Sequence, residues 1–207
     1  MTEGTSATAQ TQAARHQDAD LAAIERASAG DGSAFEALVR KYQSWVFTLA
    51  HRMLGDRAEA EDMAQEIFLK VYRALPQFEG KSTFSTWLYT IATNHCLNHL
   101  ESRRRRPRLQ EMIRSARTEG NPDPVEDRVA DPAPGADRVL EQADLRRLIQ
   151  EQLLRLTPEH RAILVLRDIQ GLAYEEIGGL LGLEPGTVRS RLHRARTELK
   201  ERLKPYR

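Results

Sequence analysis

The sequence predicts an all-α protein of two small helical domains joined by a flexible acidic linker. Ala and Leu each occur 25 times among the 207 residues, whereas Val and Ile each occur 8 times. This bias favours helices over strands. Apolar residues recur at three- and four-residue spacing on both sides of a Pro-rich stretch, as in helices that bury one face. The length fits one or two small domains, each with a hydrophobic core.

Composition excludes several classes of protein. The chain has 31 Lys plus Arg and 30 Asp plus Glu, for a net charge of +1, so a nucleic-acid surface requires local segregation of charge. A single cysteine excludes an intramolecular disulfide framework and a Cys-rich zinc site. No apolar run approaches the roughly 20 residues of a membrane span, and residues 1–17 contain no apolar signal core. We therefore expect no direct membrane insertion, a cytoplasmic location and a disordered segment 1–17.

The first domain, residues 18–106, opens with three helical segments. Each begins at a residue that can cap a helix and ends at a helix breaker. These pairs are Asp20 and Gly30, Ser33 and Gly55, and Asp56 and Pro76.

A further helical segment begins near Ser82. Its apolar stripe runs to Ile91, but the next apolar residues, Leu97 and Leu100, fall on another face. The pattern predicts a break near Thr93–Asn94, followed by a second helix that runs to about Arg104. The arginine run 103–106 then ends the domain.

Residues 107–137 are predicted to be a linker. Four prolines fall within 13 residues, and the segment from Glu119 to Asp144 has eight acids and two arginines, a local charge of −6. Such a stretch cannot bury enough apolar surface to order itself.

The second domain, residues 138–207, has the pattern of a helix-turn-helix. Thr157 and Pro158 start one helix with a capping hydroxyl and a proline at the first helical position. Tyr174 to Leu181 form a short helix, Gly182 makes the turn, and Pro185 opens a last helix that runs to about Leu203.

The last helix combines an apolar face with a basic one. Val188, Leu192, Ala195 and Leu199 share an arc that points inward, and eight cations against three acids give residues 184–207 a local charge of +5. Hydroxyl, His and Arg side chains on the other arc can bond base edges, and the flanking arginines can bond phosphates. The alternative is a basic amphipathic helix with a merely solvated face. The polar set is Gly186, Thr187, Arg189, Ser190, Arg191, His193, Arg194 and Thr197.

The helix after Asp56 has an acidic face. Residues 56–66 contain five acids and one arginine, and Glu59, Asp62 and Glu66 lie opposite the apolar stripe. This surface is either a solvated face or a docking site for a basic partner.

Residues 78–106 combine aromatic, amide and basic side chains. Aromatic residues can stack on unpaired bases, amides can bond base edges, and arginines can follow phosphates. The alternative is that Phe84 and Trp87 are core residues. The members of this set are Phe84, Trp87, Tyr89, Asn94, Asn98 and the arginines 103–106.

Four segments together resemble the extracytoplasmic-function (ECF) group of RNA polymerase sigma factors. They are Ala60-Glu-Asp-Met-Ala-Gln-Glu-Ile-Phe68, Phe84-Ser-Thr-Trp-Leu-Tyr-Thr-Ile-Ala-Thr-Asn94, Leu156-Thr-Pro-Glu-His-Arg161 and Gly186-Thr-Val-Arg-Ser-Arg-Leu-His-Arg-Ala-Arg196. The resemblance covers roughly residues 20–106 and 138–203, with the segments in the expected order. It implies that these stretches are sigma region 2 and sigma region 4.

The resemblance also implies partners and site residues. Core RNA polymerase is the implied partner, through the clamp and the flap of its large subunits. The coiled-coil clamp would bind Asp62, Gln65, Glu66 and Leu69. The −10 promoter element would be melted by a surface that includes Trp87, Tyr89, Asn94, Asn98, Arg103 and Arg104, with a flipped base near Asn94. The −35 element would contact Thr187, Arg189, Ser190, Arg191, His193 and Arg194. An anti-sigma factor is implied as a controlling partner, and no enzymatic activity, cofactor or metal is implied.

The predicted linker is long enough for this role. Promoter elements centred about 25 base pairs apart are separated by about 85 Å, and some 30 extended residues reach roughly 100 Å. The acidic linker is either a mimic of RNA in the polymerase or a solvated tether.

Three features depart from the family pattern. The adjacent glycines Gly178 and Gly179 cost roughly 1 kcal/mol each in a helix relative to Ala, so the short helix is expected to be soft. Glu184 stands where a hydroxyl cap is commoner, although its carboxylate can cap. Cys96 with two neighbouring histidines does not have a standard zinc spacing.

Two rival functions remain open. One is a helix-turn-helix transcriptional regulator that never binds core polymerase. The other is a nuclease or phosphotransferase, for which the sequence offers no carboxylate cluster or phosphate loop.

Overall fold

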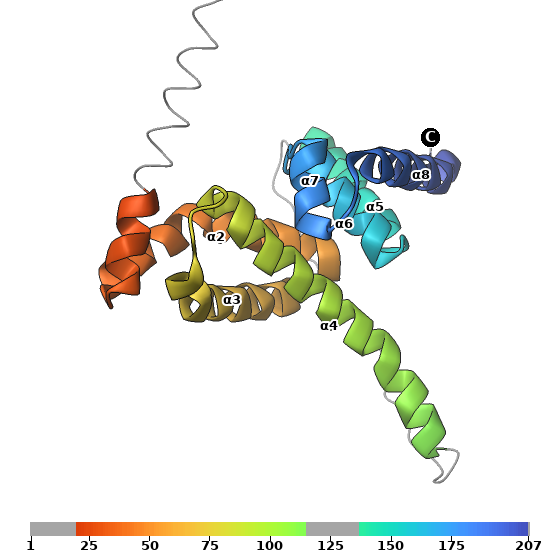
Figure 1. Ribbon diagram of the computed structural model, residues 1–207. Coiled ribbons are helices and arrows are strands. Elements are labelled where there is room, and N and C mark those ends of the chain that lie inside the picture. The colour runs from red at the N-terminus through yellow and green to blue at the C-terminus, as the bar shows by residue number, and fades with distance from the viewer. Residues whose placement is uncertain (1–19, 115–136, 207) are drawn as a thin grey trace, which may run out of the picture.

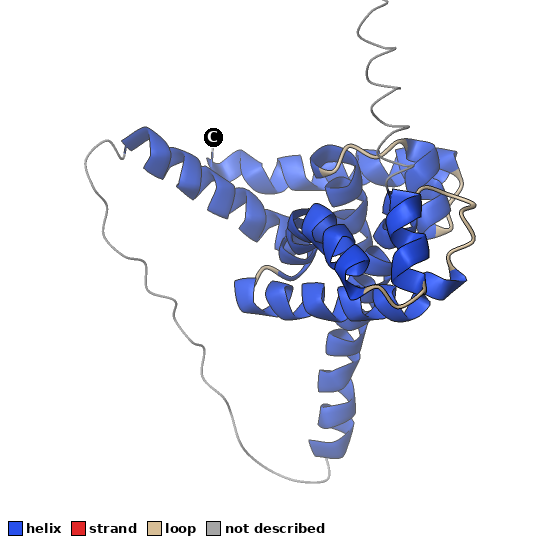
Figure 2. Ribbon diagram, turned by 90° about the vertical axis from the view of Figure 1, so that its left-hand side faces the viewer, coloured by secondary structure: helices blue, strands red, loops and turns tan. Residues whose placement is uncertain are grey.

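The protein is all-α, as predicted. The computed structural model describes residues 20–114 and 137–206, and this part of the chain contains helices and short loops but no strand (Figures 1 and 2). After a helix at residues 20–28, the elements are α2 (Gly32–Leu54), α3 (Arg57–Ala74), η1 (Leu75–Gln77), α4 (Phe84–Arg114), α5 (Asp137–Leu154), α6 (Pro158–Leu164), η2 (Val165–Ile169), α7 (Tyr174–Leu181), α8 (Pro185–Leu203) and η3 (Lys204–Tyr206). The expectation for residues 1–17 and most of the predicted linker lie outside the described residues.

The helices α2, α3 and α4 form the N-terminal unit. Their apolar stripes meet in a core in which Val46, Leu49, Ile67 and Leu88 are fully buried. Tyr42 and Phe84 make an edge-to-face contact in this core, with ring centroids 5.4 Å apart. This packing fixes α3 and α4 against α2, and it therefore positions the surfaces that these helices present.

Most helix ends in this unit follow the predicted chemistry. Gly55 ends α2 with a φ of 91°, and the Asp56 carboxylate accepts a hydrogen bond of 2.7 Å from the Glu59 backbone N–H. The predicted cap at Ser33 is wrong, because Asp31 accepts from the backbone N–H groups of Ser33 and Ala34. Asp31 directly precedes the first residue of α2, so these two donors stand at the second and third helical positions, which an N-cap side chain reaches.

Asp20 has a tertiary role. Its carboxylate is 2.6 Å from Lys41 Nζ and accepts a hydrogen bond of 2.5 Å from the Tyr42 hydroxyl. These bonds attach the helix at residues 20–28 to α2. Burial, together with the bond to Asp20, raises the pKa of Tyr42.

The predicted break near Thr93–Asn94 is wrong, because α4 is continuous from Phe84 to Arg114. The apolar residues of α4 move to a second face along the helix for a reason other than a break. The first face packs on α2 and α3, and α4 also contacts α6 and α7. Leu100, on the second face, lines a pocket with residues at the start of α6.

The prediction that the helix ends with the arginine run is also wrong. The helix α4 continues through Pro107, although an internal proline removes one backbone hydrogen bond. The segment that follows, 108–114, consists mainly of Arg, Leu, Gln, Glu and Met, which are strong helix formers. This propensity favours continuation of the helix.

The C-terminal unit contains α5 to α8. Thr157 caps α6, and the predicted inward residues Val188, Leu192 and Ala195 of α8 are buried. Between α6 and α7 the chain forms a π-helical turn, η2, and Gly171 then ends it with a φ of 77°. The two units contact each other through α4 with α6 and α7, and through α2 with α5 (Figure 1). Within the described ranges, no helix has both the length and the apolar character that crossing a membrane requires.

Candidate functional site

The helix-turn-helix is built around two glycines. Gly182 has a φ of 64°, a left-handed conformation that glycine adopts without strain. The Leu183 N–H donates to the Gly178 carbonyl at 2.8 Å. A Cβ at Gly178 would lie 2.6 Å from the Leu183 carbonyl oxygen, whereas a Cβ at Gly179 would meet open space. Of the two adjacent glycines in this short helix, the tight turn therefore requires Gly178 but not Gly179.

The start of α8 depends on its backbone and its proline. Pro185 stands at the first helical position, and the Glu184 carbonyl accepts from the N–H groups of Thr187 and Val188. The Glu184 side chain makes no capping bond, so the expected carboxylate cap is absent at this described residue.

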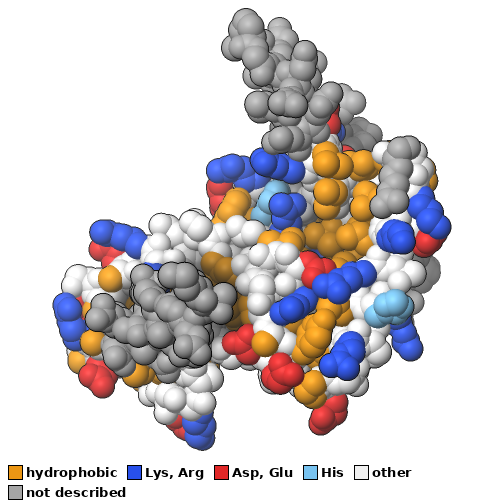
Figure 3. Space-filling view, turned by 90° about the horizontal axis from the view of Figure 1, so that it is seen from above, with side chains coloured by type: hydrophobic (Ala, Val, Ile, Leu, Met, Phe, Trp, Pro, Cys, Tyr) orange, Lys and Arg blue, Asp and Glu red, His pale blue; other side chains and the backbone are white. Residues whose placement is uncertain are grey.

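The predicted −35 residues lie together on the outer side of α8. Arg189, Ser190, His193 and Arg194 are exposed, and Thr187 and Arg191 are half-buried. Lys and Arg side chains line the side of the molecule formed by the C-terminal helices, with apolar side chains between them (Figure 3). The surface therefore offers both hydrogen-bond donors and positive charge.

The two helices of the motif are also joined through Tyr174. The guanidinium groups of Arg167 and Arg189 lie 4.9 and 5.8 Å from the centre of its ring. Arg196 of α8 pairs with Asp168 of η2, with Nε 3.0 Å from the carboxylate. These contacts hold α8 in a fixed orientation relative to the rest of the unit.

The predicted polymerase-binding residues share one face of α3. Asp62, Gln65, Glu66 and Leu69 are exposed, and their spacing brings them onto adjacent turns. Leu69 is 56% exposed, which is a large exposure for a leucine. Leu69 thus adds an apolar contact point to this otherwise polar face.

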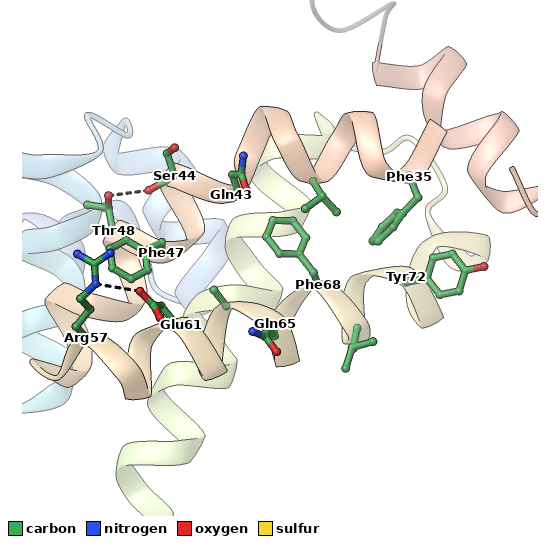
Figure 4. Close-up of a pocket in the computed structure, with 13 residues that line it drawn as sticks. Phe35, Gln43, Ser44, Phe47, Thr48, Arg57, Glu61, Gln65, Phe68 and Tyr72 are labelled. Carbon is green, nitrogen blue, oxygen red and sulfur yellow. Dashed lines mark hydrogen bonds and ion pairs between the residues drawn. The ribbon is translucent and has the colours of Figure 1, made fainter. Parts of the chain in front are cut away.

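Beside this face lies a groove between α2 and α3 that the sequence did not reveal. It has a volume of about 980 Å³, and Gln65 and Leu69 form part of its wall (Figure 4). Phe35 and Tyr72 meet edge to face at one end, with ring centroids 4.9 Å apart. The remaining apolar lining comes from Val39, Phe47, Ala64 and Phe68. The acidic face thus borders an apolar surface, a combination that suits an amphipathic helix.

The aromatic residues of α4 are partly in the core. Phe84 is 3% exposed, and Trp87 is half-buried with its ring centroid 5.3 Å from that of Phe78. Tyr89 stacks on Trp45 at a centroid distance of 3.6 Å. Burial, and to a smaller extent the Glu176 carboxylate, raises the pKa of Tyr89. The core interpretation therefore holds for Phe84, while Trp87 and Tyr89 retain partial exposure.

Two amide side chains of α4 are exposed to solvent. Asn94 and Asn98 are exposed on successive turns of α4. The structure thus brings these predicted −10 residues onto a single surface with donors and acceptors for base edges.

A ladder of side-chain hydrogen bonds between α3 and α4, with one Glu–Arg ion pair, was not predicted. Glu59 accepts from His99 Nε2 at 2.9 Å and from Arg103 at 2.7 Å. Glu66 lies 2.8 Å from His95 Nε2. Two carboxylates of the acidic face are therefore bonded to α4, and Arg103, predicted to bond phosphate, is paired with one of them. In the sequence, the two glutamates are seven residues apart, and His95, His99 and Arg103 follow one another at four-residue spacing. This pattern could have indicated the contacts between the two helices.

The same ladder accounts for the histidines near Cys96. The described ranges contain no cluster of three or more metal-ligating side chains, and both histidines bond carboxylates. Burial raises the pKa of the Cys96 thiol to about 12, which suppresses the reactive thiolate.

These surfaces, a helix-turn-helix and an acidic helix beside an apolar groove, define a DNA-binding protein that can also dock a protein partner. The family model for Sigma-70 region 2 matches residues 38–106, and that for Sigma-70, region 4 matches residues 146–199. The chain belongs to the sigma-70 family of RNA polymerase sigma factors.

Individual relatives place it within the ECF group. It is 37% identical over 189 residues to the RNA polymerase sigma-H factor of Pseudomonas aeruginosa, covering 91% of this chain and 96% of that protein. It is 36% identical over 181 residues to the ECF RNA polymerase sigma factor SigW of Bacillus subtilis, covering 87% and 95%. The structure of the sigma factor RpoE with the anti-sigma factor NepR from Bartonella quintana is similar, with a TM-score of 0.58, 25% identity, and coverage of 84% of this chain and 98% of that one.

Proposed function

We propose that the protein is an ECF sigma factor that binds core RNA polymerase, recognises the −35 and −10 promoter elements and promotes DNA melting. The observation that carries this function is the presence, in one chain, of an exposed helix-turn-helix surface and the acidic α3 face beside an apolar groove. A DNA-binding regulator needs only the first. The protein acts through binding energy, and we assign it no catalytic residue. We also propose that it acts in the cytoplasm, together with its partner enzyme.

The polymerase-binding surface comprises Asp62, Gln65, Glu66 and Leu69. The carboxylates are suited to basic residues of the polymerase clamp, and Leu69 together with the adjoining groove is suited to an apolar side chain of the same partner. Only Glu66 of this set shares its carboxylate with a histidine of α4.

The −10 surface comprises Trp87, Tyr89, Asn94, Asn98, Arg103 and Arg104. Exposed Asn94 can bond the edge of an extruded base, and partly exposed Trp87 can stack on it. Arg104, which is exposed, is better placed for a phosphate than Arg103, which is bonded to Glu59.

The −35 surface comprises Thr187, Arg189, Ser190, Arg191, His193 and Arg194. Exposed Arg194 can make a bidentate bond to a guanine edge in the major groove. Arg189, which stacks on Tyr174, is held beside the base-reading arc.

Control by an anti-sigma factor completes the proposal. The RpoE relative is seen bound to the anti-sigma factor NepR. An inhibitor that covered the α3 face or the α8 face would block polymerase or DNA.

The α3 assignment is tested by replacing Asp62 with arginine. Asp62→Arg reverses the charge at the centre of the acidic face, so affinity for core polymerase should fall at least tenfold. DNA affinity of the α8 surface should be unchanged. Glu25→Arg makes the same charge change at another exposed position and should bind core as the wild type does. If the two variants bound core polymerase with equal affinity, the acidic face would be a solvated surface and not a binding site.

The α8 assignment is tested by Arg194→Ala. Loss of a bidentate contact should cost about 1–3 kcal/mol at one base pair and relax specificity there. Arg146→Ala removes an exposed arginine from α5 and should leave promoter preference intact. Unchanged preference for Arg194→Ala would refute that contact.

A further inference from the structure

His95 of α4 bonds two side chains of α3. Its Nε2 is 2.8 Å from the Glu66 carboxylate, and its Nδ1 is 2.8 Å from Lys70 Nζ. The His95 side chain is only 14% exposed, whereas that of Glu66 is 60% exposed. A largely enclosed imidazole thus holds an exposed carboxylate that belongs to the proposed polymerase-binding surface.

These two contacts define which nitrogen of the His95 ring carries the proton. A lysine ammonium can only donate a hydrogen bond, so Lys70 donates and Nδ1 accepts. In the neutral imidazole the proton is then on Nε2, which donates to the Glu66 carboxylate. A second N–H on Nδ1 would point at the ammonium of Lys70, so the geometry favours the neutral ring. With both nitrogens bonded, the orientation of the ring is fixed.

The imidazole also bridges two charges that could otherwise meet. A glutamate four residues before a lysine on the same helix can form an ion pair with it, and Glu66 and Lys70 have this spacing. Here each of them bonds the imidazole between them. The neutral ring adds no charge of its own. Its bond uses Oε2 of Glu66, so Oε1 can accept from a basic group of a partner.

The backbone on both sides of this contact is held by the core. Ile67, next to Glu66, and Cys96, next to His95, are both fully buried. The bridge therefore joins two fixed points, and it orders the Glu66 side chain in the free protein. Ordering a long side chain at an interface costs free energy, and a carboxylate that is already held in place loses less freedom on binding.

We propose that His95 is a positioning residue of the polymerase-binding site, which holds the Glu66 carboxylate in place and prevents it from pairing with Lys70. This inference rests on the proposed sigma function. His95 acts through Glu66 and does not itself have to touch the polymerase. Without the imidazole, Glu66 and Lys70 can pair on α3, and the carboxylate is then less available to a basic partner.

The first test compares substitutions in the full-length protein by their affinity for purified core RNA polymerase. His95→Ala removes both bonds, so affinity should fall about three- to tenfold because Glu66 must then be ordered on binding. His95→Gln retains an acceptor for Lys70 and a donor for Glu66, so most of the affinity should return. The matched control is His99→Ala, one turn further along α4. His99 bonds Glu59, and its loss should leave core affinity within about twofold of the wild type.

The second test asks whether His95 acts through Glu66. Glu66→Gln alone should weaken core binding, because it removes the carboxylate charge. Adding His95→Ala to Glu66→Gln should cause little further loss, since the group that His95 positions is already gone. A general structural effect of His95→Ala would instead add in full to the effect of Glu66→Gln.

The hydrogen bonds of His95 can be measured without polymerase. Nitrogen NMR of the free protein with ¹⁵N-labelled histidine should show the His95 proton on Nε2 and a bare Nδ1 at neutral pH. The His95 signals are those that disappear in His95→Gln.

Each contrary result overturns a defined part of this inference. Full core affinity in His95→Ala, no rescue in His95→Gln, or full additivity with Glu66→Gln would overturn the positioning role. Unchanged affinity in Glu66→Gln would remove the carboxylate from the binding site and the role of His95 with it. A proton on Nδ1 would overturn the hydrogen-bond scheme. Failure of the wild type to bind core polymerase would overturn the proposed function, while the NMR spectrum would still decide the hydrogen-bond scheme.

Discussion

The adjacent glycines of α7 should respond in opposite directions to the same substitution. Gly179 faces open space, so Gly179→Ala adds a methyl group without a clash. Alanine is favoured over glycine in a helix by about 1 kcal/mol. This gain should raise the melting temperature by about 2–4 °C for a chain of this size.

At Gly178 the same gain in helix propensity is opposed by a steric conflict. The new Cβ would stand 2.6 Å from the Leu183 carbonyl oxygen and 3.8 Å from Val188 Cγ2. Because the carbonyl belongs to the backbone of the turn, relief requires the turn itself to move. Overpacking of this kind costs about 1–3 kcal/mol, which exceeds or cancels the gain. Gly178→Ala should therefore leave the melting temperature unchanged or lower it by a few degrees.

Thermal unfolding of the two variants and the wild type, followed by circular dichroism, measures both effects. The two variants have the same composition and differ only in which glycine is replaced. The reasoning would be refuted if both substitutions stabilised the protein equally, because the contact with Leu183 would then impose no constraint. A lower melting temperature for Gly179→Ala would contradict the propensity argument.

Two further predictions concern charge. Hydrogen bonds from Ser33, Arg26 and the Ala34 backbone lower the pKa of Asp31 to about 2. The contribution of Asp31 to stability is therefore present above the unfolded pKa of about 3.9 and is lost as pH falls towards about 2. In chemical denaturation, the stability of the wild type should fall more steeply over that pH range than the stability of Asp31→Asn, and parallel curves would contradict this. Arg104→Ala should reduce the salt dependence of DNA binding by about one phosphate contact, whereas Arg103→Ala should reduce it less because Glu59 already pairs with Arg103; equal slopes for the two variants would refute that distinction.

Local chemistry in the sequence was sufficient for most helix ends. Five residues at these ends act through their own backbone conformation or through a bond to a residue three positions away. They are Gly55, Asp56, Thr157, Gly182 and Pro185. Such signals do not depend on the tertiary fold, and they were interpreted correctly. The helix-turn-helix could therefore be predicted in detail.

Features that depend on contacts between distant segments were predicted poorly. The change of apolar face along α4 indicated a break because the second partner of that helix, the C-terminal unit, is far away in sequence. Likewise, Glu59 was predicted to lie on an outward face, either solvated or open to a basic partner, but it pairs with His99 and Arg103 of the same chain. The buried role of Arg161 depends on carbonyls from two units, and a residue pattern contains no signal for it.

The central claim is that the chain gives core RNA polymerase its choice of promoter. Single-round transcription by purified core polymerase on a pool of genomic fragments, with and without this protein, tests that claim most directly. The account predicts discrete new transcripts whose start sites share two upstream elements, and loss of those transcripts with Asp62→Arg. Absence of new transcripts, together with no binding of the protein to core polymerase, would contradict it.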